Sequence, residues 1–504
     1  MDYLAGMPMF RALIPFVAGI VLATHFEPSV LVTLGLLVVA ILCGWIFRRS
    51  GVGDIFICSV LLLLGMFAAA ARRGEMDTPQ GNILATIRVD EISSQREGRL
   101  YGNAIMTSYT LNREAQASRT ELRISAPAES NIMAGDFLLL GTELRPYEAD
   151  SQLIPYERYM LRTGKRADIH ISEGEILEYT HHAPLRHVAE RRLAMLDLSS
   201  DTRPIVEAIT LGNKRGITPE LRHNYTMGGS AHLLAVSGMH IGYIFLIVNL
   251  LMAWCACLHR GNILRCLAVM AAVWCYAMMV GLSPSVVRAA VMFSLLHIGL
   301  MTPYYTRSLN ILSATAFVML VLDSSQLFDV GFQLSTIAVL AIMEWAAPLY
   351  RMMIPSTPVD TLVKPHYNLA HYIKSASKSL MQRSVIALAV AVVTTLAIMP
   401  LVASAFGTIS LWSVAIGSLT ILLCGIAQAA ALLWILMPFD STSALATWIV
   451  EHSVSAMNTI NEWCAQSGYL SAEIEFSTEL CWICYTIFAA ATVVKWGFAK
   501  GQKK

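Results

Sequence analysis

The residues MGGSAHLLAVSGMHIG at positions 227–242 are the most informative part of the sequence about its fold. Its apolar piece, residues 232–236, is bracketed by glycines and is followed by Ser237 and Gly238. This piece is far shorter than the roughly 20 residues that a membrane-spanning helix needs. Unwound backbone at membrane depth occurs only where protein or a water-filled cavity surrounds it. Broken helices of this kind mark transport pathways in other membrane proteins, so the stretch predicts a polar path inside a membrane domain.

The composition around this stretch is that of a membrane protein. The chain has 504 residues, of which 56% are hydrophobic and 14% are charged, and its mean hydropathy is +0.56. Soluble domains carry roughly 25% charged residues. Long apolar runs recur at 30–47, 55–71, 241–258, 266–280, 286–300 and 385–402. We therefore predict a polytopic α-helical membrane protein with one small extramembrane all-β domain.

Changes in periodicity along the chain divide it into four parts. Residues 1–73 predict three transmembrane helices. Residues 74–182 contain short alternating runs separated by turn signals, which predict an external OB-like β domain. Residues 183–224 predict an amphipathic, interfacial helical linker. Residues 225–504 predict a transmembrane channel domain.

Basic residues between the apolar runs predict the orientation in the membrane. Arg48 and Arg49, the stretch 351–383 and the lysines up to Lys504 are rich in positive charge. Cytoplasmic loops carry such an excess of Lys and Arg. The β domain is therefore expected outside, in the periplasm if the cell is Gram-negative, and the C-terminus in the cytoplasm.

A few polar residues stand inside the apolar segments. Arg288 is expected to have a functional role or a partner, because a charge within a membrane costs several kcal/mol. Asp329 is its natural partner, and the spacing of Asp329 and Gln333 predicts that they share one helix face. The sequence leaves open whether Arg288 and Asp329 tie two helices together or line a pore.

His232 and His240 are eight residues apart, so they would share a face of a continuous helix unless Ser237 and Gly238 break it. Hydrogen bonding between helices, pore lining and metal ligation are all open to these histidines. A metal site needs three or four ligands, and no such cluster is visible in the sequence.

The predicted β domain has one strip of basic residues. Arg158, Arg162, Lys165 and Arg166 follow each other closely, although the domain as a whole carries 17 acidic against 11 basic residues. Binding of single-stranded nucleic acid relies on a basic groove with aromatic rings. The strip is either such a contact or an ordinary solvated face.

Several blocks of the sequence resemble the ComEC family of competence proteins, in the order that the family has them. They read AITLGNKRGITPEL (208–221), HLLAVSGMHIG (232–242), GLSPSVVRAAVM (281–292), RSLN (307–310) and LFDVGFQLSTIAV (327–339), and PYERYMLRTGKRA (155–167) resembles the end of the family's OB-like domain. Many members continue into a metallo-β-lactamase-like domain. Its His-x-His-x-Asp-His motif does not occur in this sequence, so no nuclease function is assigned.

The resemblance implies a channel that passes single-stranded DNA through the membrane during natural transformation. The pore-lining residues would be His232, Ser237, Gly238, His240, Arg288, Asp329, Gln333 and Ser335, and the basic strip would guide DNA. The resemblance implies a cytoplasmic helicase-like ATPase and an external DNA-binding competence protein as partners, besides membrane lipid. We expect no catalytic residue, metal or cofactor, and the sequence has no Gly-x-x-x-x-Gly-Lys-Ser/Thr motif for ATP.

Three other functions remain open at this level. A small-solute permease would need the same polar path. An intramembrane hydrolase would use Ser237 with His232 or His240, although a serine between apolar helices equally allows close packing. A scaffold for competence factors would need no path at all.

Overall fold

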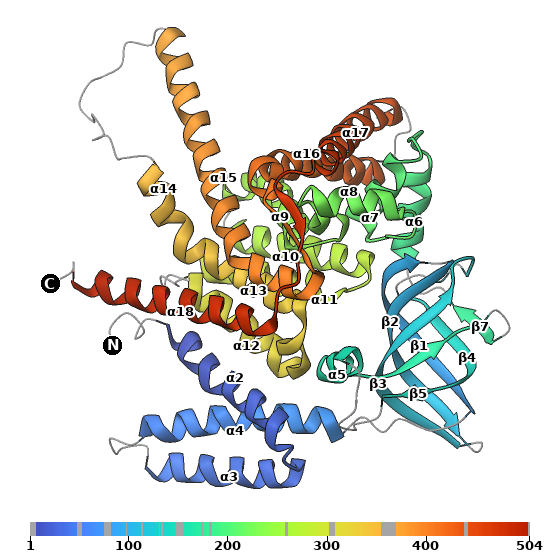
Figure 1. Ribbon diagram of the computed structural model, residues 1–504, viewed down its shortest axis with the longest axis vertical. Coiled ribbons are helices and arrows are strands. Elements are labelled where there is room, and N and C mark those ends of the chain that lie inside the picture. Colours follow the sequence, from blue (N-terminus) through green and yellow to red (C-terminus); the bar gives the residue numbers. More distant parts are fainter. Residues whose placement is uncertain are drawn as a thin grey trace. The chain divides into compact units, whose positions relative to one another are not determined.

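The computed structural model describes residues 7–47, 53–74, 82–96, 98–111, 114–130, 132, 135–147, 155–172, 175–180, 184–257, 261–301, 308–353, 369–437 and 442–501. The basic residues Arg48, Arg49 and Lys504, which carry the predicted orientation, lie outside these ranges. The chain, whose helices and strands are labelled in Figure 1, divides into two compact units. The first comprises residues 1–218, 233–333 and 425–455, and the second comprises residues 219–232, 334–424 and 456–504.

Three apolar helices lead the first unit, at the place where the sequence predicts three spans. They are α2 (Pro8–Phe26), α3 (Val30–Ile46) and α4 (Gly53–Gly74). Ser29 caps α3, since its hydroxyl accepts a hydrogen bond from the amide of Val32 at 3.3 Å. α2 and α4 approach closely at two glycines: a Cβ atom added to Gly19 would lie 1.9 Å from the carbonyl oxygen of Leu62. Small residues allow such contact between membrane helices.

The β domain follows α4. Its strands are β1 (Asn82–Arg96), β2 (Arg99–Leu111), β3 (Glu114–Pro127), β4 (Phe137–Glu143), β5 (Arg145–Pro146), β6 (Lys165–His170) and β7 (Ile176–Thr180), in the sheet order β5-β6-β3-β2-β1-β4-β7. β3 and β6 run parallel, and the other pairs are antiparallel. β4 pairs with β1 and β5 pairs with β6, yet only Leu144 separates β4 from β5 in the chain. The sheet therefore curves back on itself into the barrel-like form seen in Figure 1.

Alternation along the strands builds the interior of this domain. On β1, Ile83, Ala85, Ile87 and Val89 are all buried, and their neighbours point outward, as the two-residue period of a strand requires. A short helix, α5 (Pro155–Arg162), connects β5 to β6. The β domain that the sequence predicts is therefore confirmed, whereas its assignment to the OB class stays a prediction.

Helices make up the rest of the first unit. They are α6 (Pro184–Ala194), α7 (Thr202–Leu211), α9 (Gly238–Leu251), η2 (Ala253–Cys257), α10 (Gly261–Val280), α11 (Pro284–Met301), α12 (Ser308–Leu322) and η3 (Ser324–Phe328). In the predicted linker, Trp434 donates a hydrogen bond to the carbonyl of Arg192 at 2.8 Å, and Glu451 accepts from Ser199 and Thr202 at the start of α7. The linker is thus packed against later helices, and its interfacial placement stays a prediction.

The second unit contains the remaining elements. These are α8 (Pro219–Met227), η4 (Ile342–Ala346), α14 (Ala347–Met353), α15 (Leu369–Phe406), β8 (Thr408–Ser410), β9 (Ser471–Glu473) and α18 (Thr478–Gly501). Four described helical elements contribute to both units: η1 (Ala231–Leu234), α13 (Val330–Ala341), α16 (Trp412–Leu436) and α17 (Ser443–Ser467).

Seven helices in the described part of the chain are long and apolar enough to cross a membrane. They cover residues 8–26, 54–72, 261–280, 330–350, 385–406, 412–436 and 478–495, and shorter apolar helices lie at 30–46, 238–251, 285–299 and 308–322. The prediction of a polytopic helical membrane protein with a β domain is confirmed.

Candidate functional site

The stretch 227–242 is broken, as its sequence predicts. α8 ends at Met227, the 3₁₀ turn η1 covers Ala231–Leu234, and α9 begins at Gly238. His232 and His240 therefore lie on separate elements. The backbone amide of Ser237 donates to Nδ1 of the buried His240 at 3.0 Å, and the Ser237 hydroxyl lies 3.1 Å from the same nitrogen. This reciprocal capping arrangement explains why the helix starts where it does.

The start of α9 packs closely against α11. A Cβ atom on Gly238 would lie 3.5 Å from Cβ of Ala289, and one on Gly242 would lie 3.3 Å from the ring of Phe293. The glycines let the two helices approach, as small residues do in membrane bundles. The break in the chain is thereby placed beside Ala289, the residue that follows Arg288.

Arg288 faces Asp329 in the first unit. Nη1 of Arg288 lies 3.7 Å from Oδ1 of Asp329, and the arginine side chain is 8% exposed whereas that of Asp329 is 36% exposed. The guanidinium also lies 5.8 Å from the centre of the Phe332 ring. A Cβ atom on Gly331 would lie 3.3 Å from Nη2, so glycine leaves the space that the arginine occupies. The pair therefore has one buried end and one end open to its surroundings.

The predicted helix face shared by Asp329 and Gln333 is wrong in one respect. Asp329 precedes α13, and its Oδ1 accepts a hydrogen bond from the amide of Phe332 at 2.8 Å, so it caps the helix from outside. The amide group of Gln333 donates to the carbonyl of Leu327 at 2.9 Å and ties the preceding turn to the helix. Ser335, further along α13, is exposed.

The first half of the broken stretch lies in the second unit, among polar groups that sequence reasoning missed. Tyr225 donates to Oδ1 of Asn458 at 2.7 Å, and Ser410 donates to the carbonyl of Met227 at 2.7 Å. A Cβ atom on Gly228 would lie 2.3 Å from Oδ1 of Asn461, which is fully buried. The signal in the sequence was two asparagines three residues apart on α17. His232 itself is exposed.

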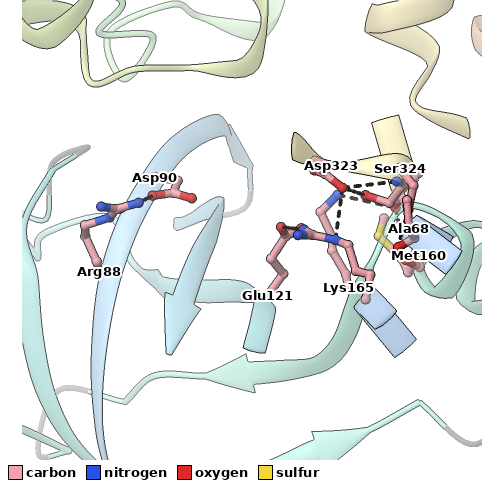
Figure 2. A network of polar contacts seen from close by, with 11 residues as sticks. Ala68, Arg88, Asp90, Glu121, Met160, Lys165, Asp323 and Ser324 are labelled. Atoms are coloured by element: carbon pink, nitrogen blue, oxygen red, sulfur yellow. Dashed lines mark hydrogen bonds and ion pairs between the residues drawn. The ribbon is translucent and has the colours of Figure 1, made fainter. Parts of the chain in front are cut away.

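A junction of charges joins the β domain to the helices of the first unit (Figure 2). Arg72, in the last turn of α4, pairs with Glu121 on β3 and with Asp323, whose Oδ1 lies 2.9 Å from its Nε. Asp323 also accepts from the amide and the hydroxyl of Ser325 at 3.0 and 2.6 Å. All three charged side chains are largely buried. The arginine thus connects a membrane helix, a strand and the turn before α13.

The position of Glu121 in this junction shifts the pKa of its carboxyl group. Burial raises the pKa of Glu121, although Arg72 and Lys165 act in the opposite direction. Lys165 pairs with Glu121 in the register of β3 and β6, and Figure 2 places both in the same network. Gly164 has a φ of +88°, and a Cβ atom there would lie 3.0 Å from the Ser325 hydroxyl. The chain before β6 therefore needs glycine to approach η3.

The predicted DNA-guiding strip lies on α5 and β6. Arg162 is exposed, Lys165 and Arg166 are half-buried, and the side chain of Arg158 is outside the described residues. The neighbouring Tyr159 lies against the start of α13: burial, and then the charge of Asp329, raise its pKa, while a hydrogen bond to the backbone of Val330 lowers it. The structure thus brings Tyr159 of α5, the helix that carries part of the strip, next to Asp329.

Two further polar groupings were missed because their members are far apart in the sequence. In the first unit, Tyr276 donates to the carbonyl of Thr210 at 3.1 Å and accepts from the amide of the buried Gln428 at 3.1 Å. In the second unit, Lys495 pairs with Glu344 at 2.9 Å, and Glu344 lies in a π-helical turn. Within the ranges that the structure describes, no three His, Cys, Asp or Glu residues gather as metal ligands would.

Together, the fold and the site define a multi-pass helical membrane protein with an attached β domain and buried polar groups beside a broken helix. A family model described as "Competence protein" matches residues 209–498. Because this match covers more than half of the chain, the protein belongs to the ComEC family of competence proteins.

One relative is ComE operon protein 3 of Bacillus subtilis (strain 168). It is 29% identical to this chain over 169 residues, which make up 32% of this chain and 20% of the relative. The chain is thus aligned with about a fifth of that relative's length. No solved structure matches the chain.

Proposed function

We propose that this protein passes single-stranded DNA through the inner membrane during natural transformation. Membership of the competence family supports a role in DNA uptake. The observation that carries the proposal is the contact of α5 with the start of α13. Through it, Tyr159 of α5, the helix that also carries Arg162, lies beside Asp329, and Asp329 lies 3.7 Å from Arg288. The helix with part of the basic strip therefore lies close to the start of α11, where Arg288 is.

The electrostatics of the pair suit a passing phosphate. Arginine binds phosphate oxygens with two parallel hydrogen bonds. Asp329, which is partly exposed, competes with the phosphate for Arg288 and keeps the bond to any one phosphate weak. Conduction requires binding that is favourable enough to admit the strand and weak enough to release it. Beyond the pair, the strand would pass the break at Ser237, Gly238 and His240, with Gln333 as a further lining residue of the first unit. His232 and Ser335 stay predicted lining residues of the second unit.

The orientation and the partners follow from the same proposal. The β domain would face outward and the C-terminus would face the cytoplasm, in agreement with the distribution of Lys and Arg. Because the sequence has no phosphate-binding loop for ATP, a cytoplasmic helicase-like ATPase would drive the strand. An external DNA-binding competence protein would deliver it.

Uptake of labelled DNA by the native host tests the proposal. The gene is deleted and then complemented with the wild type, with Arg288→Gln/Asp329→Asn, or with Arg191→Gln. Arg191 is an exposed arginine of α6 and serves as the control for loss of a charge. We expect deletion and the double variant to abolish transformation and the control to restore it. Normal transformation after deletion would contradict the proposal, and solute uptake without DNA would then favour a permease.

The contact between Ser237 and His240 invites a second proposal, an intramembrane hydrolase. The distance of 3.1 Å from the Ser237 hydroxyl to Nδ1 is one that a nucleophile and its base adopt. The same Nδ1, however, accepts the backbone amide of Ser237 at 3.0 Å. A lone pair used for helix capping does not serve as a general base, so the channel is the better proposal.

A further inference from the structure

Three polar residues lie on α9, α10 and α11, away from Arg288. They are Asn249, Arg265 and His297. His297 follows Arg288 by nine residues on α11, which corresponds to about 14 Å along a helix. Asn249 is near the end of α9 and Arg265 near the start of α10. Since consecutive helices alternate in direction, all three residues lie at the ends of the helices opposite to Arg288.

Packing brings these side chains to the same end of the three helices. The ring of His297 meets the ring of Phe245 edge-on at 5.4 Å, and Asn249 lies one turn after Phe245 on the same face of α9. Arg265 precedes the buried Tyr276 by 11 residues, or three turns, so it lies on the face of α10 that enters the core. Trp274 of α10 donates to the hydroxyl of Ser294 on α11 at 3.2 Å, so α10 runs beside α11, and the charge of Arg265 reaches the His297 ring.

The polar atoms of this cluster lack partners. His297 is 4% exposed, and both of its ring nitrogens, Nε of Arg265 and Oδ1 of Asn249 are buried without a hydrogen-bond partner among the described residues. A buried polar group left unsatisfied destabilises the folded protein, because it loses its hydrogen bonds to water without replacing them. Native proteins retain such groups where a ligand, an ion or water satisfies them. The cluster therefore has the features of a binding site.

The chemistry of the cluster selects an anion. Its unpartnered donors come from the guanidinium of Arg265 and the imidazole of His297, and its fixed charge is positive, whereas the unpartnered atom of Asn249 is the acceptor Oδ1, so this amide would meet an anion through its NH₂ group. The sequences of α9, α10 and α11 contain no Asp or Glu, so no acid on these helices neutralises Arg265. Guanidinium groups match the geometry of phosphate oxygens. The set is thus suited to a phosphate group and differs from the pair at Arg288, where Asp329 competes.

We propose that Asn249, Arg265 and His297 form a second phosphate-binding site, which holds the DNA strand at the far ends of α9–α11. This inference rests on the proposed function, because it takes the phosphate from a strand in transit. A phosphate from a lipid headgroup is the competing occupant. Two sites about 14 Å apart along α11 would hand the strand from one to the next.

Thiol labelling in native membrane vesicles tests the site without DNA. The variants are His297→Cys and, as its matched control, Ile298→Cys, whose parent residue is 44% exposed on the outer face of the same helix. The labelling of the parent chain, which has its own cysteines, is subtracted from that of each variant. We expect an anionic water-soluble methanethiosulfonate to label Cys at 297 faster than the cationic reagent. Adding Arg265→Gln should change this ratio by about tenfold, the effect of one charge at close range.

Three results would overturn the site. They are absence of labelling at 297 by either charged reagent, equal rates for the two reagents, and a ratio that Arg265→Gln leaves unchanged. Asn249→Cys provides a second reporter with the same expectations, in case His297→Cys does not reach the membrane. Slowing of the anionic reagent by added phosphatidylglycerol, but not by a short oligothymidylate or by inorganic phosphate, would assign the site to lipid and would also overturn the proposal.

DNA uptake in the host separates this inference from the proposed function. We expect Arg265→Gln to lower transformation at unchanged protein level and Arg265→Lys to restore part of it. If deletion of the gene leaves transformation intact, the proposed function fails, whatever the labelling shows. If deletion abolishes transformation but Arg265→Gln transforms like the wild type, the channel stands and the second site is not on the route of the strand.

Discussion

Arg72 at the end of α4 and Asp323 before α13 form an ion pair, with 2.9 Å between Nε and Oδ1. The same guanidinium pairs with Glu121 of the β domain. One side chain therefore holds the strand β3 and the turn η3 to the third apolar helix. Because Asp329 lies at the C-terminal end of η3, this junction also positions the acid that faces Arg288.

Replacing Arg72 tests how much the junction contributes to stability. Arg72→Met leaves Glu121 and Asp323 as two acids without their shared cation, and loss of charged hydrogen bonds of this kind costs about 2 kcal/mol. Arg88→Met is the matched control, because Arg88 pairs with Asp90 at 3.0 Å on a more exposed part of the barrel (Figure 2). Such surface pairs contribute about 0–1 kcal/mol. Thermal unfolding of the purified protein in detergent should show a clearly larger loss for Arg72→Met; equal losses would contradict a structural role for the junction.

The raised pKa of Glu121 predicts a dependence on pH. Burial disfavours the charged carboxylate, so the folded protein binds the proton more tightly than the unfolded chain does, whose carboxyl has an ordinary pKa of 4.5. The contribution of Glu121 to stability is therefore fully present below pH 4.5 and is lost as the pH rises through the raised pKa.

Glu121→Gln isolates this contribution. Melting temperatures of the wild type and the variant are recorded from acidic to neutral pH. As the pH rises, the melting temperature of the wild type should fall relative to that of Glu121→Gln. A difference that is constant with pH would show that Glu121 keeps its ordinary pKa in the folded protein.

The close approach of α2 and α4 predicts opposite effects for two glycine substitutions. Gly19→Ala places a Cβ atom 1.9 Å from the Leu62 carbonyl oxygen, whereas Gly35→Ala on α3 meets nothing within 4 Å. Forcing atoms into a packed contact costs about 1–3 kcal/mol or more. Alanine in an open helical position is better than glycine by about 0.5–1 kcal/mol. Unfolding in detergent should show Gly19→Ala destabilised and Gly35→Ala at or above the wild type; the reverse order would mean that the helices do not pack at Gly19.

Substitutions at the start of α9 distinguish capping from catalysis. Ser237→Ala keeps the backbone amide that donates to His240, so we expect a loss of about 1 kcal/mol in stability and largely retained DNA uptake. His240→Ala removes the acceptor and should lower both more strongly. The readouts are melting temperature and transformation frequency. Labelling of Ser237 by a serine-reactive probe, together with loss of all function in Ser237→Ala, would instead support the hydrolase proposal.

Local patterns account for what could be predicted about the fold. The length of the apolar runs predicts spans, the two-residue alternation from Ile83 to Val89 predicts a strand, and the glycines around residues 228–238 predict a break. Each of these signals acts over a few residues, because hydrogen bonding and side-chain direction repeat within one turn or one pleat. Pairing of Arg288 with Asp329 was predictable for another reason: a charge in a membrane has few partners available.

Local sequence patterns were thus enough to predict that this chain enters the membrane, where its helix breaks, and which buried charge needs a partner. They could not predict that Arg72 joins Glu121 to Asp323, or that Tyr159 of α5 lies beside Asp329. These contacts join residues on separate elements, and each residue alone is an ordinary polar side chain on a helix, a strand or a turn. Their proximity arises from packing of whole helices and strands, which no local spacing records.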